Sequence, residues 1–149
     1  MKKRIRPFAQ YDFPTLLAID QSCFDPSVAY DEWELALFMS GPGSRTLVAE
    51  ADDDIAGFIM VELHPKTRTA TLITLDVLKP YRKQHIGSLL LGEAEQILLS
   101  EKIRHHSLQV DTQNTAAIGF YEHHGFQTID TLPNYYGNGA DAYVMRKKL

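Results

Sequence analysis

The stretch Leu75-Asp-Val-Leu-Lys-Pro-Tyr-Arg-Lys-Gln-His-Ile-Gly-Ser-Leu-Leu-Leu91 decides how this chain folds. A strand pattern gives way to apolar residues at helical spacing, with Pro80 and a basic segment between them. The free N–H groups at a helix start, aligned with the helix dipole, bind anions, and Arg82 and Lys83 add positive charge. Gly87 would let a ligand approach the backbone closely, which favours a phosphate or pyrophosphate. The alternative is a helix cap with a solvated basic turn.

The rest of the chain predicts strands and helices in alternation. The expected strands cover residues 3–8, 45–51, 55–63, 69–77, 107–110, 126–131 and 140–146. The expected helices cover about 12–24, 30–39, 86–101 and 114–124. Asp12 should cap the first helix, and Gly125 should end the last one. With no repeat or linker, we expect one α/β domain over residues 1–149.

Composition and charge exclude several classes of protein. The 149 residues are 44% hydrophobic and 23% charged, which is typical of a globular domain, and no apolar window is long enough for a membrane span. A basic N-terminus without an apolar segment after it predicts no signal peptide and a cytoplasmic protein. The net charge of −4, without a basic stripe, argues against a nucleic-acid partner. The single cysteine, Cys23, is expected to pack, and the histidines lack the spacing of a metal site.

A second motif is Asn114-Thr-Ala-Ala-Ile-Gly-Phe-Tyr-Glu-His-His-Gly-Phe126. Its Asn114, Ala117 and Tyr121 share one helical face, which by itself could be a core face with a satisfied tyrosine. The motif resembles the N-x-x-A-x-x-x-Y-x-x-x-G-F pattern of the GCN5-related N-acetyltransferases (GNAT). The segment 82–87 likewise resembles their R/Q-x-x-G-x-G/A pyrophosphate loop. His85 stands where the first glycine is expected, which should re-shape the loop, although histidine tolerates positive φ better than most residues.

This resemblance implies a fold and a co-substrate. The family fold is a mixed, mostly antiparallel sheet of about seven strands with about four helices, splayed between the fourth and fifth strands to admit acetyl-CoA. No metal is expected. The implied acetyl-CoA-binding residues are Val77, Leu78, Arg82, Lys83, Gln84, His85, Ile86, Gly87, Ser88, Asn114, Ala117 and Tyr121.

The resemblance also implies the direct transfer of an acetyl group from acetyl-CoA to an amine. Main-chain N–H groups near Val77 and Leu78 would face the thioester carbonyl, and Tyr121 would donate a proton to the departing thiolate. Relatives often place a glutamate or histidine base where this chain has Gln109, and glutamine cannot accept a proton. Candidate replacements, directly or through water, are Asp76, Asp111 and Glu62, each of which could equally be a solvated carboxylate.

The segment 134–145 resembles the C-terminal signature of ribosomal-protein-alanine N-acetyltransferases and other N-terminal acetyltransferases. This implies that Tyr135 and Tyr136 hold the first residues of a substrate, with Phe24 and Tyr30 opposite. A site without a strong base also suits an α-amine, because its pKa of about 7.7–8.0 leaves more of it neutral at pH 7 than a lysine. We therefore expect a protein or peptide N-terminus, such as that of a ribosomal protein, as the acceptor.

Two other functions stay open from the sequence. A polyamine, amino acid or aminoglycoside could be the acceptor, and an acidic, narrow cleft would favour such a small amine. Because of His85 and Gln109, the chain could instead bind acyl-CoA as a sensor without turnover. The sequence also leaves open whether exposed strands pair two copies into a homodimer.

Overall fold

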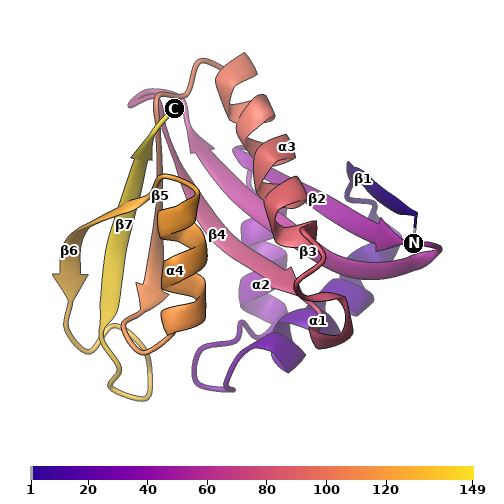
Figure 1. Ribbon diagram of the computed structural model, residues 1–149, viewed down its shortest axis with the longest axis horizontal. Helices are drawn as coiled ribbons and strands as arrows, with labels where there is room; N and C mark the ends of the chain where they lie inside the picture. The colour runs from indigo at the N-terminus through magenta and orange to yellow at the C-terminus, as the bar shows by residue number, and fades with distance from the viewer. Residues whose placement is uncertain (1) are drawn as a thin grey trace.

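The computed structural model of the protein describes residues 2–149, which form a mixed seven-stranded sheet and four α-helices (Figure 1). The strands are β1 (Lys3–Pro7), β2 (Ser44–Ala51), β3 (Asp54–His64), β4 (Thr69–Val77), β5 (His105–Asp111), β6 (Gln127–Leu132) and β7 (Ala142–Lys148). The helices are α1 (Phe13–Cys23), α2 (Glu32–Ser40), α3 (Ile86–Ser100) and α4 (Thr115–His123). The expected fold class, with its seven strands and four helices, is confirmed.

The sheet opens between its two central strands. Its order is β1-β2-β3-β4-β5-β7-β6, and β4 and β5 are parallel neighbours, whereas the other pairs are antiparallel. β4 and β5 pair only where Thr69, Ala70 and Thr71 meet His105, His106 and Ser107. Beyond these pairs the two strands diverge, as Figure 1 shows below the upper edge of the sheet. The expected splay is therefore present, and it leaves the end of β4 without a partner on that side.

The helices cover both faces of the sheet, with α1 and α2 behind it and α3 and α4 in front (Figure 1). Apolar side chains of β3 alternate between two cores. Phe58 and Met60 pack with Leu16 of α1 and its neighbours, whereas Ile59 faces the core that includes Leu90 of α3. β3 is apolar along most of its length because both of its faces are buried.

A β-bulge in β4 changes which side chains face α1. Met60 pairs with Thr74, but the next residue, Val61, pairs with Leu72, so that Ile73 is an extra residue on β4. The Ile73 carbonyl accepts a hydrogen bond from the Tyr30 hydroxyl at 3.4 Å. From the bulge onward, Thr74 and Asp76 point toward α1. This orientation brings Asp76 to the site described below.

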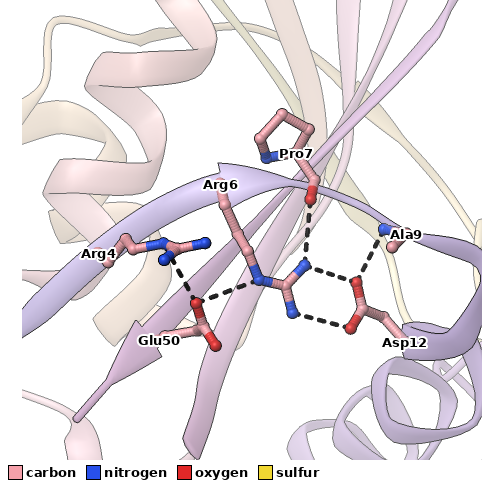
Figure 2. Close-up of polar contacts among 6 residues, drawn as sticks. All are labelled: Arg4, Arg6, Pro7, Ala9, Asp12 and Glu50. Carbon is pink, nitrogen blue, oxygen red and sulfur yellow. Dashed lines mark hydrogen bonds and ion pairs between the residues drawn. The ribbon is translucent and has the colours of Figure 1, made fainter. Parts of the chain in front are cut away.

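The contacts that hold the start of α1 differ from the predicted Asp12 cap. A short 3₁₀ turn, Gln10–Asp12, precedes the helix, and the Asp12 carboxylate makes no cap hydrogen bond to α1. Asp12 instead accepts two hydrogen bonds from Arg6 at 2.8 and 2.9 Å and one from the Ala9 N–H at 2.8 Å (Figure 2). Arg6 also contacts Glu50 on β2 at 3.1 Å. The expectation that Asp12 caps the helix is wrong, because Arg6 attracts its carboxylate toward β1.

Polar side chains also shift two other boundaries. Asp31 caps α2 by accepting a hydrogen bond from the Glu34 N–H at 2.8 Å, so Tyr30 lies outside the helix. The loop before β7 is held by a hydrogen bond from the Ala140 N–H to Asn138, which delays that strand to Ala142. Within residues 2–149, no helix is long and apolar enough to cross a membrane.

Candidate active site

A cleft of about 900 Å³ lies where β4 and β5 diverge. It is lined by residues from α1, β4, the turn before α3, β5, α4 and the loop between β6 and β7. The predicted site residues that line it are Phe24, Tyr30, Asp76, Val77, Arg82, Lys83, His85, Ile86, Gly87, Ser88, Gln109, Asn114, Ala117, Tyr121, Tyr135 and Tyr136. Leu78 and Gln84 do not line it, so the fold assembles nearly all of the predicted residues in one place.

The basic end of the cleft is built on the first turn of α3. Within the described residues, no side chain caps this helix, so the N–H groups of Ile86, Gly87 and Ser88 point out of its first turn without a helical partner. His85 has φ +65° and Lys83 has φ +63°, so the turn adopts the left-handed conformation that a glycine would take. The histidine therefore substitutes for the expected glycine with its backbone in the same region. This geometry suits an anion at the start of α3.

Two residues of the turn serve structural contacts. The Arg82 guanidinium donates to the Val77 carbonyl at 2.8 Å and lies 3.7 Å from the Cys23 sulfur, so it points into the cleft. The Gln84 side chain donates to the Pro80 carbonyl at 3.3 Å, and its main-chain carbonyl accepts a hydrogen bond from Lys3. Gln84 thus holds the turn in place and, unlike its neighbours in the predicted pyrophosphate loop, does not line the cleft.

The middle of the cleft is narrow and apolar. A side chain at Gly87 would place its Cβ 3.4 Å from the Phe120 ring, so the glycine keeps this passage open. Ala117 lines the same passage with a small side chain. The Asn114 side-chain oxygen caps α4 by accepting a hydrogen bond from the Ala117 N–H at 3.2 Å. The amide NH₂ of Asn114 remains able to donate to a ligand in the cleft.

Tyr121 reaches the cleft from α4 while its ring is buried. The ring packs edge-on against Phe120 and Phe126, with centroids 5.4 and 5.6 Å away. Burial raises the pKa of the Tyr121 hydroxyl above its ordinary value, and the Asp76 carboxyl adds to the shift. The phenol is therefore protonated at neutral pH and can donate its proton.

The two main-chain N–H donors predicted near the end of β4, those of Val77 and Leu78, differ in whether they are free to bind a ligand. The Leu78 N–H donates to the Ala56 carbonyl at 2.9 Å and is not available to a ligand, so the prediction is wrong for Leu78. Val77 pairs with Gly57 across β3 and precedes Leu78, so its N–H points the opposite way, toward the space from which β5 has diverged. Val77 is thus the donor that could face an acyl carbonyl.

The three candidate bases, Asp76, Asp111 and Glu62, differ in whether they line the cleft and in the hydrogen bonds that they already make. Asp76 lines the cleft and is 1% exposed, whereas Asp111 lines it with a carboxylate that already accepts a hydrogen bond from the Gln113 N–H at 2.9 Å. Glu62 pairs with Thr71 across the sheet, lies 3.7 Å from His64 and does not line the cleft, so it is not positioned to act as a base. Gln109 lines the cleft from β5.

The other end of the cleft is aromatic. Tyr135 and Tyr136 stack edge-on with centroids 5.0 Å apart, and Phe24 and Tyr30 line the cleft from the loop between α1 and α2. Partial burial raises the pKa of Tyr136 to about 12. A Cβ at Gly137 would lie 3.7 Å from the Ser27 carbonyl, which shows that the two loops approach each other over this end.

The sequence model of the acetyltransferase (GNAT) family matches residues 12–126. The chain belongs to this family. Its matched region contains the turn before α3, the diverging strands and α4, which together build the cleft.

Relatives of this GNAT chain include acetyltransferases of known activity. An N-alpha-acetyltransferase of Sulfurisphaera tokodaii is 29% identical over 79% of this chain and 72% of its own. The ribosomal-protein-S18-alanine N-acetyltransferase of Escherichia coli has a similar structure, with a TM-score of 0.87, 25% identity and coverage of 99% of this chain and 94% of its own. The PaiA N-acetyltransferase of Thermoplasma acidophilum, solved in complex with coenzyme A, has a TM-score of 0.80 and 26% identity, and covers both chains completely. The chain is thus an N-acetyltransferase of the GNAT family.

The cleft of this GNAT enzyme also contains polar residues that sequence reasoning missed. Asp20 of α1 and Thr74 of β4 line it beside Asp76, as does Cys23, which was expected only to pack. Burial raises the pKa of the Cys23 thiol, with Asp76 adding to the shift, so Cys23 is a poor nucleophile. Among residues 2–149, no group of three or more histidine, cysteine or acidic side chains could hold a metal ion.

Proposed function

We propose that this N-acetyltransferase transfers the acetyl group of acetyl-CoA directly to the N-terminal α-amine of a protein or peptide. The proposal rests on one observation above all. The cleft joins an anion-binding helix start at one end to an aromatic-walled opening at the other, with the unpaired end of β4 between them. Such a passage fits a long anionic thioester entering from one side and an amine from the other.

The residues at the basic end fit acetyl-CoA. The N–H groups of residues 86–88 and the charge of Lys83 would hold the pyrophosphate, and Gly87 and Ala117 would leave room for the pantetheine arm. Asn114 would donate its amide NH₂ to that arm. Bound there, the co-substrate supplies an activated acyl carbon, and the chain contributes orientation and proton transfer.

Three groups of the chain would act at the acyl end. The Val77 N–H would stabilise negative charge on the acyl oxygen, and Tyr121 would protonate the departing sulfur. The transfer forms a C–N bond and breaks the thioester C–S bond. An ammonium that becomes an amide gives up two protons, of which one ends on the sulfur. Asp76 is positioned to accept the other.

The aromatic end supports a chain terminus as the acceptor. The loops approach each other near Ser27 and Gly137, which favours a peptide that enters end-on, with its first residues against Tyr135 and Tyr136. The α-amine is also the peptide amine that is easiest to deprotonate near neutral pH. The relatives that acetylate N-termini, including that of a ribosomal protein, support the same acceptor.

Mass spectrometry of a peptide panel incubated with the protein and acetyl-CoA tests the proposal. The panel holds free Ala-, Ser- and Met-starting peptides, an N-blocked lysine peptide and several small amines. We expect acetylation of free N-termini alone. Tyr135→Ala should raise KM for these peptides about tenfold, whereas Tyr11→Ala, an exposed tyrosine outside the cleft, should not. Efficient acetylation of the internal lysine would contradict the proposal.

A small amine is the second candidate acceptor, and one observation favours it. Asp20, Asp76 and Asp111 make the cleft acidic beyond the basic turn, and the touching loops narrow its opening. A polyamine would be attracted by these charges. Transfer only to the small amines of the panel would establish this acceptor. Binding of acetyl-CoA without transfer to any amine would instead indicate a sensor.

A further inference from the structure

Two buried carboxyl groups meet at the wall of the cleft. Asp20 of α1 is 0% exposed and Asp76 of β4 is 1% exposed, and both line the cleft. Thr74 lies between them, with its hydroxyl 2.5 Å from Asp76 Oδ1 and 3.4 Å from Asp20 Oδ1. The Tyr30 N–H donates to Asp20 Oδ2 at 2.9 Å. The β4 bulge and α1 thus bring two carboxyl groups together.

The donors around this pair are too few for two carboxylates. Thr74 has one hydroxyl proton, which can serve only one of the two groups at a time. Asp76 Oδ2 is buried and has no hydrogen-bond partner among residues 2–149. A buried acceptor without a donor is costly, so this oxygen is suited to a donor that arrives with a ligand.

Charge balance indicates the kind of donor. In the described part of the chain, neither Asp20 nor Asp76 forms a salt bridge. The Arg82 cation is close enough to act on the pKa of Asp76, but its guanidinium donates to the Val77 carbonyl and faces Cys23. Burial, together with the Asp20 carboxyl, raises the pKa of Asp76 well above its ordinary value. The raised pKa makes Asp76 a stronger base than an ordinary carboxylate.

We propose that the Asp20–Thr74–Asp76 cluster binds the acceptor as an ammonium ion and that Asp76 takes its proton, while Asp20 positions Asp76 and tunes its basicity. This inference rests on the proposed function, because it places the acceptor amine in the same cleft. An ammonium supplies both the positive charge and the N–H donor that the cluster lacks. The cluster fills the chemical role that Gln109 cannot.

The groups that face the cluster define its pH dependence. They are Cys23 on α1, Tyr30 in the following loop, Arg82 in the turn before α3 and Tyr121 on α4. Tyr30, Tyr121 and Cys23 have pKa values raised by burial, and arginine stays charged. The acid limb of kcat/KM should therefore report the carboxyl pair.

Carboxyl NMR of the protein without co-substrate tests the pair directly. In the wild type, one aspartate should titrate well above the ordinary range, and this titration should be absent in Asp76→Asn. In Asp20→Asn, which keeps an acceptor for the Tyr30 N–H, the Asp76 midpoint should fall by about one pH unit because the like charge is gone. Asp25→Asn is the matched control, since Asp25 is exposed in the same cleft and its carboxylate accepts hydrogen bonds from Ser27.

Binding and kinetics give independent readouts. The wild type should bind a free-amine peptide at least tenfold more tightly than the same peptide with a blocked N-terminus, and Asp76→Asn should abolish this preference. At pH 7, Asp76→Asn should lower kcat/KM about 100-fold. The loss should shrink above pH 8, where the α-amine is already neutral. Asp20→Asn should shift the acid limb to lower pH and raise KM for the free-amine peptide more than it lowers kcat.

The outcomes separate this inference from the proposed function. If the wild type acetylates peptide N-termini but both variants keep its pH profile and its preference for a free amine, the inference is overturned and the proposed function stands. If the wild type acetylates no amine and shows no preference for the free-amine peptide, both fail. The NMR titration of the wild type needs no variant, and an ordinary midpoint for both aspartates would also overturn the inference.

Discussion

At the scale of single residues, Tyr121 is the side chain whose chemistry can be tested most simply. Its hydroxyl is buried and protonated, and its side chain lines the cleft. We expect Tyr121→Phe to lower kcat by about 100-fold, because a general acid contributes roughly that factor, while the affinity for CoA is unchanged. Steady-state kinetics with CoA titration would measure both. Tyr143→Phe, a partly buried tyrosine on β7 outside the cleft, is the control. An equal loss in both variants would contradict the role of Tyr121.

The sequence predicted site residues well where a motif carried them and poorly elsewhere. The face of α4 with Asn114 and Tyr121 follows directly from helical spacing. Asp20 was missed because a single carboxylate within a helix belongs to no motif. A signal was present, since Asp20 shares a helical face with Leu16 and Cys23 and so occupies a position directed at the core. The sequence could not predict that Asp76 lies beside Asp20, because a β-bulge determines which side chains of β4 point toward α1.

At the scale of elements, the start of α3 depends on a strained residue. His85 has φ +65°, a conformation that costs most side chains about 1–2 kcal/mol and glycine almost nothing. We expect His85→Gly to raise the free energy of unfolding by about 0.5–1 kcal/mol and His85→Ala to lower it. The affinity for CoA should be retained or improved in His85→Gly, because glycine lets the phosphates approach the backbone. Chemical denaturation and CoA titration would measure these effects.

Lys102 provides the matched control for His85. It has φ +63° just after α3, is exposed and lies outside the cleft. Lys102→Gly should stabilise the protein by a similar amount without changing the affinity for CoA. If both variants changed the CoA affinity equally, the change in His85→Gly would reflect the stability of the whole protein and not the shape of the pyrophosphate loop.

Element types were predictable from periodicity, whereas their ends depended on side-chain contacts. All strands and helices were expected close to where they lie, and β4 matched at both ends. The error at Asp12 arose because its partner, Arg6, is close in sequence but belongs to a strand whose position only the sheet defines. A carboxylate before a helix usually caps it, and only a competing arginine changes that outcome.

At the scale of the whole molecule, the cleft exists because β4 and β5, which join the two parts of the sheet, pair at only three positions. The splay between β4 and β5 was expected from family resemblance alone, since alternation along single strands does not specify their neighbours. The structure adds what holds the junction. Glu95 of α3 accepts a hydrogen bond from Lys147 of β7 at 2.6 Å and lies 3.0 Å from the ring of buried His106 on β5. His106 pairs with Ala70, where β4 and β5 are still together.

This junction predicts a pH-dependent stability. Although burial would raise the pKa of Glu95, hydrogen bonds from His106 and Lys147 hold it below the ordinary value. Because the folded-state pKa is lowered, the stabilisation is fully present above the ordinary pKa of glutamate, near 4.5, and is lost as pH falls through the folded-state value. We expect Glu95→Gln to lower the free energy of unfolding by about 1–3 kcal/mol at pH 7. The difference from the wild type should fade as the pH falls through the lowered folded-state pKa of Glu95.

Denaturation at several pH values, with hydrogen exchange of the β5 amides, would measure this effect. Exposed Glu93 on α3 is the control, and Glu93→Gln should change neither quantity. Faster hydrogen exchange in β5 at neutral pH would show that Glu95→Gln loosens the part of the sheet where β4 and β5 still pair. The affinity for CoA should then fall as well, because this pairing sets the distance between the two sides of the cleft. A loss of stability that is the same at every pH would mean that Glu95 acts through packing and not through its charge.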